Sequence, residues 1–185
     1  MRTALVRVLL CLSLMAPLLP AVAAPLRDVA SGLGVAPPPG YTAEPIPAQG
    51  DQTARFALRR PTDRDTGCQV AYVPAPQNAA MSQEQLNRLM ATPRWQELVL
   101  ATLAPRYTPL RSAPYAHAGI GGLSLVADFR PGQGLPDRAG AVRSLFVIQE
   151  TPKGRTTLVC LGEKAEFAAR EAEFLAVARG ITPPR

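Results

Sequence analysis

The stretch VCLGEKAEFAAREAEFLAVARGITPP, residues 159–184, decides the fold. An apolar run ends at Cys160, a glycine follows, and a helical pattern then continues to Gly180 and a pair of prolines. The apolar residues of this pattern recur at helical spacing: Phe167, Phe174, Ala178 and Ile181. The spacing predicts an amphipathic helix that ends near Gly180. The charged residues fall mainly outside the apolar stripe and are expected to face solvent: Glu163, Glu166, Arg170, Glu173 and Arg179.

Two apolar strands precede this helix. VRSLFVIQE (residues 142–150) and TTLVCLG (residues 156–162) are apolar over most of their length, and TPKGR between them has turn residues. This arrangement predicts a hairpin of central strands that are covered on both faces. The C-terminal helix is expected to provide part of that cover, so it packs on a sheet.

Shorter strands are expected earlier in the chain, where apolar and polar residues alternate. They cover residues 41–47, 54–60, 68–74 and 123–129, with an irregular strand over 107–113. Pro45 and Pro47 confine the first strand to a sheet edge, because proline cannot donate a ladder hydrogen bond. In RFALRRP (residues 55–61) arginines alternate with apolar residues, which predicts a strand with one solvated face.

A helical segment lies between these strands, over residues 82–104. Ser82 and Gln85 have the spacing of a capping box, and Thr92 followed by Pro93 marks a second helix start. The segment is therefore one kinked helix or two short helices. Trp95 falls on its apolar side and is expected in the core.

These patterns predict an α+β fold: a largely antiparallel sheet covered by the middle helical segment and the C-terminal amphipathic helix. The fold occupies a single domain over residues 40–185, a length that can bury a core of its own. Residues 24–39 contain VASGLGVAPPPG, whose glycines and prolines predict a flexible leader before the domain.

Residues 1–23 have the pattern of a secretory signal peptide. Arg2 and Arg7 give the positive start, residues 8–19 give the apolar region, and residues 21–23 (Ala-Val-Ala) give a small-x-small cleavage site. The apolar region is too short for a membrane-spanning helix, which needs about 20 apolar residues. We expect cleavage after Ala23, a periplasmic or secreted protein, and no transmembrane anchor after cleavage.

Cys68 and Cys160 are the two cysteines that remain after cleavage. An even number of cysteines in an exported chain favours a disulfide bond over free thiols. The bond closes a loop for which chain entropy suggests about 4–5 kcal/mol of stabilisation. A catalytic thiol needs a neighbouring base, and the one histidine of the chain, His117, belongs to no recognisable cysteine–histidine motif.

Four stretches together resemble one known family. They are PPPGY before the first strand, SQEQLNRLM at the start of the middle helix, AGIGGLSLVADF as a glycine turn into a strand, and TTLVCLGEKAEFAAREAEFLAVARGI at the end. Their order resembles the PsbP-like αβα sandwich, the family of photosystem extrinsic subunits and Ran-binding Mog-type proteins. The resemblance implies a binding or accessory module in an exported compartment, and it transfers no binding residue to this chain.

Composition argues against several function classes. After cleavage 18 basic and 14 acidic residues remain, and the arginines are scattered without a run of four. Nucleic-acid binding is therefore not expected, because it needs a basic stripe with interleaved aromatic residues. One histidine and two bonded cysteines predict no metal site and no cofactor. No nucleophile motif is recognisable, so catalytic residues are not assigned.

One segment, PRYTPLRSAPYAHAG, gathers residue types that are enriched at recognition sites. The candidate binding residues are Arg106, Tyr107, Arg111, Tyr115 and His117; an ordinary surface loop explains the segment as well. We expect a non-catalytic binding or accessory module whose partner is an envelope or extracellular protein or a small ligand. The alternative is a small exported hydrolase with an unrecognised acid–base pair.

Overall fold

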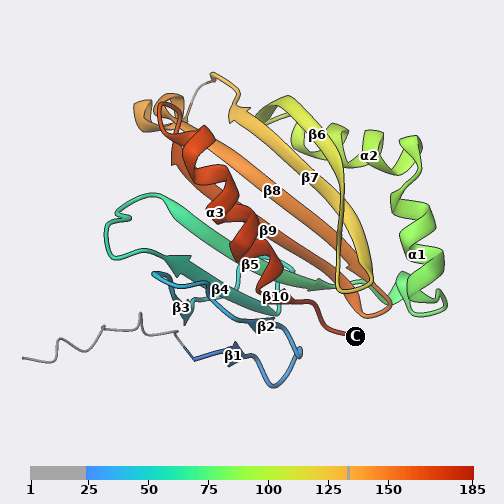
Figure 1. Ribbon diagram of the computed structural model, residues 1–185. Helices are drawn as coiled ribbons and strands as arrows, with labels where there is room; N and C mark the ends of the chain where they lie inside the picture. Colours follow the sequence, from blue (N-terminus) through green and yellow to red (C-terminus); the bar gives the residue numbers. More distant parts are fainter. Residues whose placement is uncertain (1–23, 133) are drawn as a thin grey trace, which may run out of the picture.

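The computed structural model describes residues 24–132 and 134–185, so the signal-peptide prediction lies outside the described residues. In chain order the elements are β1 (Leu26–Arg27), β2 (Gly34–Val35), β3 (Thr42–Pro45), β4 (Ala54–Arg59), β5 (Gly67–Pro74), η1 (Pro76–Asn78), α1 (Gln83–Met90), α2 (Pro93–Leu103), β6 (Tyr107–His117), β7 (Ile120–Phe129), η2 (Asp137–Ala141), β8 (Val142–Thr151), β9 (Gly154–Glu163), α3 (Phe167–Arg179) and β10 (Ile181–Thr182). The α-helices and the larger sheet confirm the α+β class (Figure 1).

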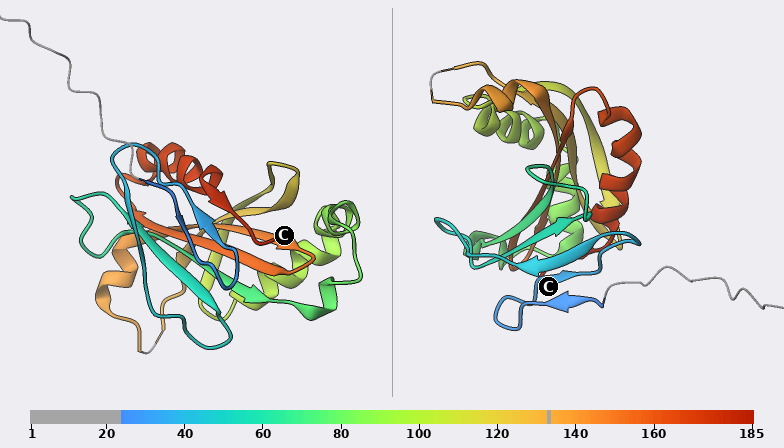
Figure 2. Two further views of the ribbon diagram at one scale, coloured as in Figure 1. Left: turned by 90° about the horizontal axis from the view of Figure 1, so that it is seen from below. Right: turned by 90° about the vertical axis from the view of Figure 1, so that its left-hand side faces the viewer.

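A seven-stranded antiparallel sheet forms the middle layer, in the order β3-β4-β5-β9-β8-β7-β6. Helices α1 and α2 lie on one face of this sheet and α3 lies on the other (Figure 2). A small three-stranded sheet, β1-β2-β10, lies on the same side as α3 and packs into the same core. The molecule is therefore an αβα sandwich, in which β5, the strand before the helical segment, pairs with β9, the strand before α3.

Each face of the sheet carries its own apolar core. On the α3 side, Phe174 and Val177 of the helix pack with Leu58, Val70 and Leu158 of the strands. On the opposite side, the middle helices and strands β7 and β8 share a second core that contains Leu86, Met90, Trp95, Leu123 and Phe146. The predicted core position of Trp95 is confirmed.

The middle segment forms two short helices, and both predicted starts are confirmed. The Ser82 side chain accepts a hydrogen bond from the Gln85 backbone N–H, and the Gln85 side chain accepts one from the Ser82 backbone N–H. Thr92 caps α2, whose first residue is Pro93. These signals are local in sequence, which explains why they could be read without the tertiary structure.

Strands β8 and β9 form the expected hairpin at the centre of the sheet, but only β8 is covered on both faces. Nearly every residue of β8 is buried, whereas in β9 buried residues alternate with half-buried or exposed ones. The prediction of two fully covered strands is therefore wrong for β9. The physical reason is that α1 lies over β7 and β8, and none of the helices in the described part of the chain extends over the outward side of β9 and β5.

Residues 24–39 are part of the fold, so the prediction of a flexible leader is wrong. Leu33 and Val35 are buried, and β2 pairs with β1 and with β10. Ile181 belongs to β10 and not to α3. The end of α3 lies close to the backbone of Ala36, which follows β2. Glycine is required at position 180, because a Cβ atom there would lie 2.0 Å from the Ala36 carbonyl oxygen.

Cys68 and Cys160 face each other directly in the β5–β9 ladder and form a disulfide bond. Both residues are buried in the core on the α3 side. The predicted bond is thus present, and it joins two strands that are 92 residues apart along the chain.

We expect reduction of this bond, or the substitution Cys160→Ser, to lower the thermal unfolding midpoint of the mature protein. The reason is that the bond limits the conformations of the unfolded chain, an effect of about 4–5 kcal/mol for a loop of this length. Thermal unfolding followed by circular dichroism, with and without reductant, measures the effect. Two titratable thiols in the native, unreduced protein would show that the bond is absent.

Candidate functional site

The uncovered part of the sheet is the candidate site. We call it the open face: the side chains of β4, β5 and β9 that point away from α3 and lie outside the cover of α1 and α2. It contains Arg55, Arg59, Gln69, Ala71, Arg155, Thr157, Val159 and Leu161. The right-hand view of Figure 2 shows the bent sheet with α2 at one end of this region and the β4–β5 hairpin at the other. Half-buried apolar side chains and arginines therefore share one unobstructed surface.

An apolar groove of 230 Å³ lies at the α2 end of the open face. Trp95, Leu98 and Val99 form the helical wall, and Phe146 and Ile148 of β8 form the floor. Leu98 is 51% exposed although it is a large aliphatic side chain. An exposed leucine beside a buried tryptophan makes this groove the apolar part of the site.

Arg155 closes the groove on the β9 side and is held in place by a buried carboxylate. Its Nε donates to Glu150 Oε1 at 2.6 Å, and Asn78 Nδ2 donates to Glu150 Oε2 at 2.9 Å. Glu150 is buried, so its charge requires these partners. The guanidinium therefore has a fixed position at the groove rim.

A second cavity, of 130 Å³, lies at the opposite end of the open face. Arg59, Arg64 and Gln69 line it together with Val159 and Leu161. Asp65 also lines it, but both oxygens of that carboxylate accept hydrogen bonds from Arg138. We call this cavity the arginine pocket, because two guanidinium groups contribute to its wall while its one carboxylate is neutralised by a third.

The carboxylates of the fold are mostly bound to arginine, and their pKa values reflect it. Hydrogen bonds from Arg138 lower the pKa of Asp65 and of Glu163. Hydrogen bonds from Arg143, followed by Lys164, lower the pKa of Asp128. These carboxyl groups stay ionised at neutral pH, which suits ion pairing and not proton donation.

The five residues predicted to bind a partner lie on one strand, not on a loop. They belong to β6 or precede it directly, and β6 is an edge strand of the sheet. Pro109 and Pro114 are tolerated there because an edge strand leaves some N–H groups without a ladder partner. Tyr107 and His117 are ten residues apart, about 30 Å in an extended strand, so the segment does not form one compact cluster.

A bulge between Pro109 and Arg111 also divides these residues between the two faces of the sheet. Tyr107 packs against Phe129 and Phe146 on the α2 side, with ring centroids 4.8 and 4.9 Å apart. Arg111 binds Glu171 of α3 on the other side, at 2.5 Å.

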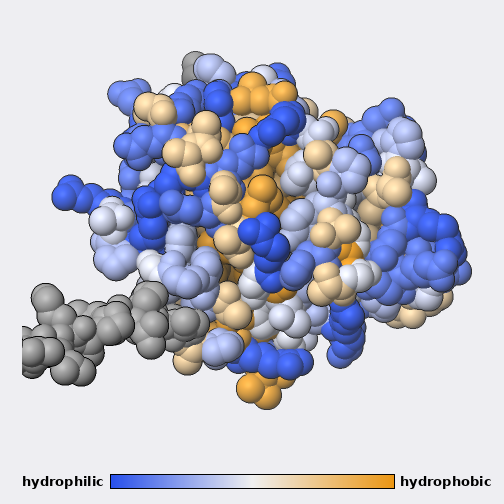
Figure 3. Space-filling view, viewed as in Figure 1, coloured by the Kyte–Doolittle hydropathy of each residue, from blue (hydrophilic) through white to orange (hydrophobic). Residues whose placement is uncertain are grey.

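Tyr115 packs against the core on the α3 side, whereas Arg106 is exposed at the start of the strand. Figure 3 shows apolar surface between α3 and the neighbouring strands, where Ala113, Leu145 and Leu175 line a furrow. The binding role of β6 stays a prediction.

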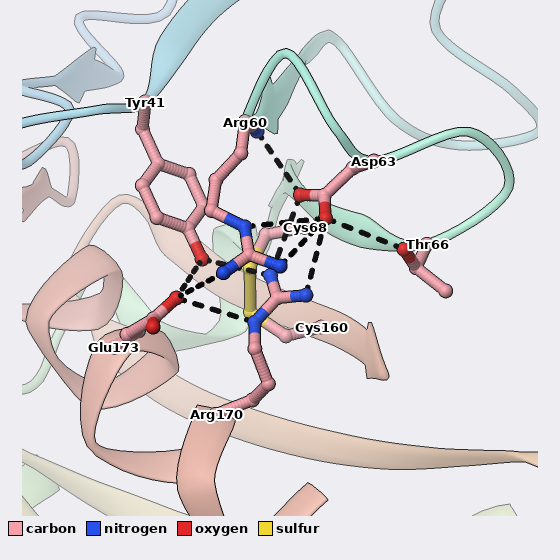
Figure 4. Close-up of a disulfide and its surroundings, with 8 residues drawn as sticks. All are labelled: Tyr41, Arg60, Asp63, Thr66, Cys68, Cys160, Arg170 and Glu173. Carbon is pink, nitrogen blue, oxygen red and sulfur yellow. Dashed lines mark hydrogen bonds and ion pairs between the residues drawn. A yellow bond between two sulfur atoms is a disulfide. The ribbon is translucent and has the colours of Figure 1, made fainter. Parts of the chain in front are cut away.

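Arg170 is buried at 6% exposure, so the prediction that it faces solvent is wrong. Its Nη1 lies 3.1 Å from Asp63 Oδ1, and its Nη2 donates to Tyr41 Oη at 3.0 Å. Arg60 joins both Asp63 and Glu173, beside the Cys68–Cys160 disulfide (Figure 4). This cluster fastens the β4–β5 turn, which forms one wall of the arginine pocket, to helix α3.

Sequence reasoning missed the open face, although part of its signal was visible. The alternation in residues 55–61 predicts that Arg55 and Arg59 share a solvated face, and they do. What sequence could not provide is the position of α1 and α2, which decides which strands stay uncovered. Among residues 24–132 and 134–185, no three His, Cys, Asp or Glu side chains lie close enough to hold a metal ion.

Comparison with known proteins identifies the fold class. No family model and no curated protein sequence matches the chain. The solution structure of cyanobacterial PsbP (CyanoP) from Synechocystis sp. PCC 6803 matches 86% of this chain and 91% of that chain, with a TM-score of 0.55 and 11% identity. A crystal structure from Bacteroides thetaiotaomicron matches 89% of this chain and 50% of that chain, with a TM-score of 0.50 and 12% identity. The fold is therefore PsbP-like, and identities this low show the fold alone.

The buried Asp63–Arg170 pair gives a stability prediction. Burial by itself raises the pKa of Asp63, but hydrogen bonds from the Arg60 N–H and from Arg170 outweigh it and lower the pKa overall. Asp63→Asn removes the buried carboxylate that pairs with Arg170 and leaves it only Glu173, 3.2 Å from its Nε, so we expect a loss of about 3 kcal/mol in the free energy of unfolding. Urea unfolding measures it. Glu84→Gln, which breaks the exposed Glu84–Arg88 pair, is the matched control and should cost about 0.5 kcal/mol or less.

The same pair predicts how this difference depends on pH. Because the folded-state pKa of Asp63 is lowered, its stabilisation is fully present above the unfolded value of about 3.9 and is lost as the pH falls through the folded value. The gap between wild type and Asp63→Asn should therefore shrink as the pH falls below about 4. A gap that stayed constant down to about pH 2 would contradict the ion-pair explanation.

Proposed function

We propose that the chain is an exported, non-catalytic binding or accessory module that contacts its partner through the open face. The observation that carries this proposal is the uncovered centre of the sheet. Strands at the middle of a sheet are normally covered, yet here β9 contributes to an apolar groove at one end of the open face and, with β5, to the arginine pocket at the other. Such a surface is typical of a site where another molecule completes the cover.

Export is supported by the signal-peptide pattern of residues 1–23 and by the Cys68–Cys160 bond. Disulfides persist in oxidising compartments such as the periplasm and are rare in reducing ones. None of the helices in the described ranges is long and apolar enough to cross a membrane.

A binding role is favoured over hydrolysis by the state of the carboxyl groups. A carboxyl that donates a proton near neutral pH needs a raised pKa. The pKa of Asp63, Asp65, Asp128 and Glu163 is instead lowered. Each of them is held by arginine, so the small exported hydrolase expected as an alternative lacks support from these groups.

The export part of the proposal predicts the mature N-terminus. When the full chain is expressed in a Gram-negative host, the form recovered from the cell envelope or the medium should begin at Ala24. Intact-mass analysis of that form measures the cleavage. A full-length chain confined to the cytoplasm would contradict export and leave the disulfide without its compartment.

The binding part predicts that partner recovery depends on the open face. In an affinity pull-down from envelope extract, mature protein with Leu98→Asp should recover at least about tenfold less partner, because a charge in the apolar groove opposes burial. Leu110→Asp on β6 is the matched control, since Leu98 and Leu110 are 51% and 49% exposed. It should bind like wild type.

A second variant separates the open face from the β6 segment. Arg106→Ala combined with His117→Ala removes two of the predicted binding residues without touching the groove. Loss of the partner with this variant or with Leu110→Asp, together with full recovery by Leu98→Asp, would place the binding surface on β6. Equal thermal midpoints across all variants are required, so that lost binding is not lost folding.

A further inference from the structure

This inference rests on the proposed binding function. The chemistry of the open face indicates which class of partner it would bind. Its two cavities measure 130 and 230 Å³, whereas sites for drug-sized molecules measure about 300–1,000 Å³. Each cavity is the right size for a single side chain. The open face is therefore suited to a macromolecule that inserts two side chains and lies across the surface between them.

The arginine pocket selects the chemistry of the first side chain. Arg59 and Arg64 form no ion pair with any residue in the described ranges. Gln69 Oε1 accepts a hydrogen bond from Arg55, so the remaining polar group of that amide is an NH₂ donor. Guanidinium and amide donors around one small cavity match a carboxylate.

The apolar groove selects the second side chain. Its wall and floor are aromatic and aliphatic, and its volume fits a leucine or phenylalanine side chain. Arg155, already bound to Glu150, limits the groove without offering a free charge.

Strand β9 sets the spacing between the two side chains. It contributes Arg155 and Thr157 to the groove and Val159 and Leu161 to the arginine pocket. Corresponding positions are four residues apart, about 14 Å along a strand. An extended peptide spans the same distance with four residues, so its acidic and apolar residues must be separated by three others.

We propose that the partner is a protein that lays an extended acidic segment across the open face, with a carboxylate in the arginine pocket and an apolar side chain in the groove. The excess of basic over acidic residues after cleavage, 18 against 14, favours the approach of such a segment. The arginines select a negatively charged side chain of the partner, and the groove fixes which residue of the segment lies opposite each strand position.

The test uses mature protein and synthetic five-residue peptides with blocked ends. The probes are Glu-Ser-Thr-Ser-Leu and its reverse, Leu-Ser-Thr-Ser-Glu, because the direction of the segment is open. Trp95 is the one tryptophan of the chain and lines the groove, so its fluorescence reports occupancy directly. At least one probe should bind, and replacing its glutamate by glutamine or its leucine by serine should weaken binding at least about tenfold.

Variants of the protein locate the contact. Arg59→Ala with Arg64→Ala should weaken the peptide at least about tenfold and flatten the dependence of affinity on salt. The matched control is Arg179→Ala, which removes an exposed arginine from α3 on the other face and should change nothing. Equal binding of the glutamate and glutamine peptides, or wild-type affinity in the double variant, would overturn carboxylate recognition.

Two further outcomes separate this inference from the proposed function. Saturation by acetate or free glutamate at the affinity of the peptide would make the occupant a small anion and overturn the extended segment. If neither peptide binds while Leu98→Asp still abolishes partner recovery from extract, the open face binds a partner of other chemistry. The inference then fails and the binding function stands. If neither peptide binds and Leu98→Asp leaves partner recovery unchanged, both the acidic-segment inference and the proposed binding function are rejected.

Discussion

The structure depends on how the two faces of its seven-stranded sheet are buried, because few helices and strands are available to cover them. Helix α3 and the small β1-β2-β10 sheet bury the face that holds the disulfide. Helices α1 and α2 are short and bury only the β7–β8 part of the other face. The alternating burial of β9, the exposed Leu98 and the two cavities all follow from this shortage. The candidate site is thus the remainder of an incomplete sandwich.

A buried polar cluster holds the less covered end of the sheet in place. The β4–β5 turn has little apolar contact of its own, and Asp63 ties it to Arg170 of α3 instead. Burying this arginine is favourable only because carboxylate, hydroxyl and aromatic partners surround it, the last being Phe174 at 4.8 Å from the guanidinium carbon. The turn also carries Arg64 and Asp65, so the stability of the core and the shape of the arginine pocket are linked through the ion pairs of Asp63 with Arg170 and of Arg60 with Glu173.

Sequence predicted most of the fold because most of its signals are local. The caps at Ser82 and Thr92, the alternation in residues 54–60 and the proline at the β3 edge need no tertiary information. Residues 24–39 were misjudged because strands of two residues carry no period. Arg170 was misjudged because its partner, Asp63, lies 107 residues away. The site could not be predicted for a related reason. The open face is the part of the sheet that α1 and α2 do not cover, and the residues of β5 and β9 give no information about where those helices pack.

The position of the disulfide has a consequence for the chain after proteolysis. Cys68 and Cys160 enclose α1, α2 and the strands from β6 to β8, and they bond across the central pair of strands. A backbone cut anywhere between them, including one in the connection that carries the two short helices, yields two fragments that remain covalently joined. The paired strands on either side of the bond keep their ladder as well. A single nick in this interval therefore does not release either half of the sheet.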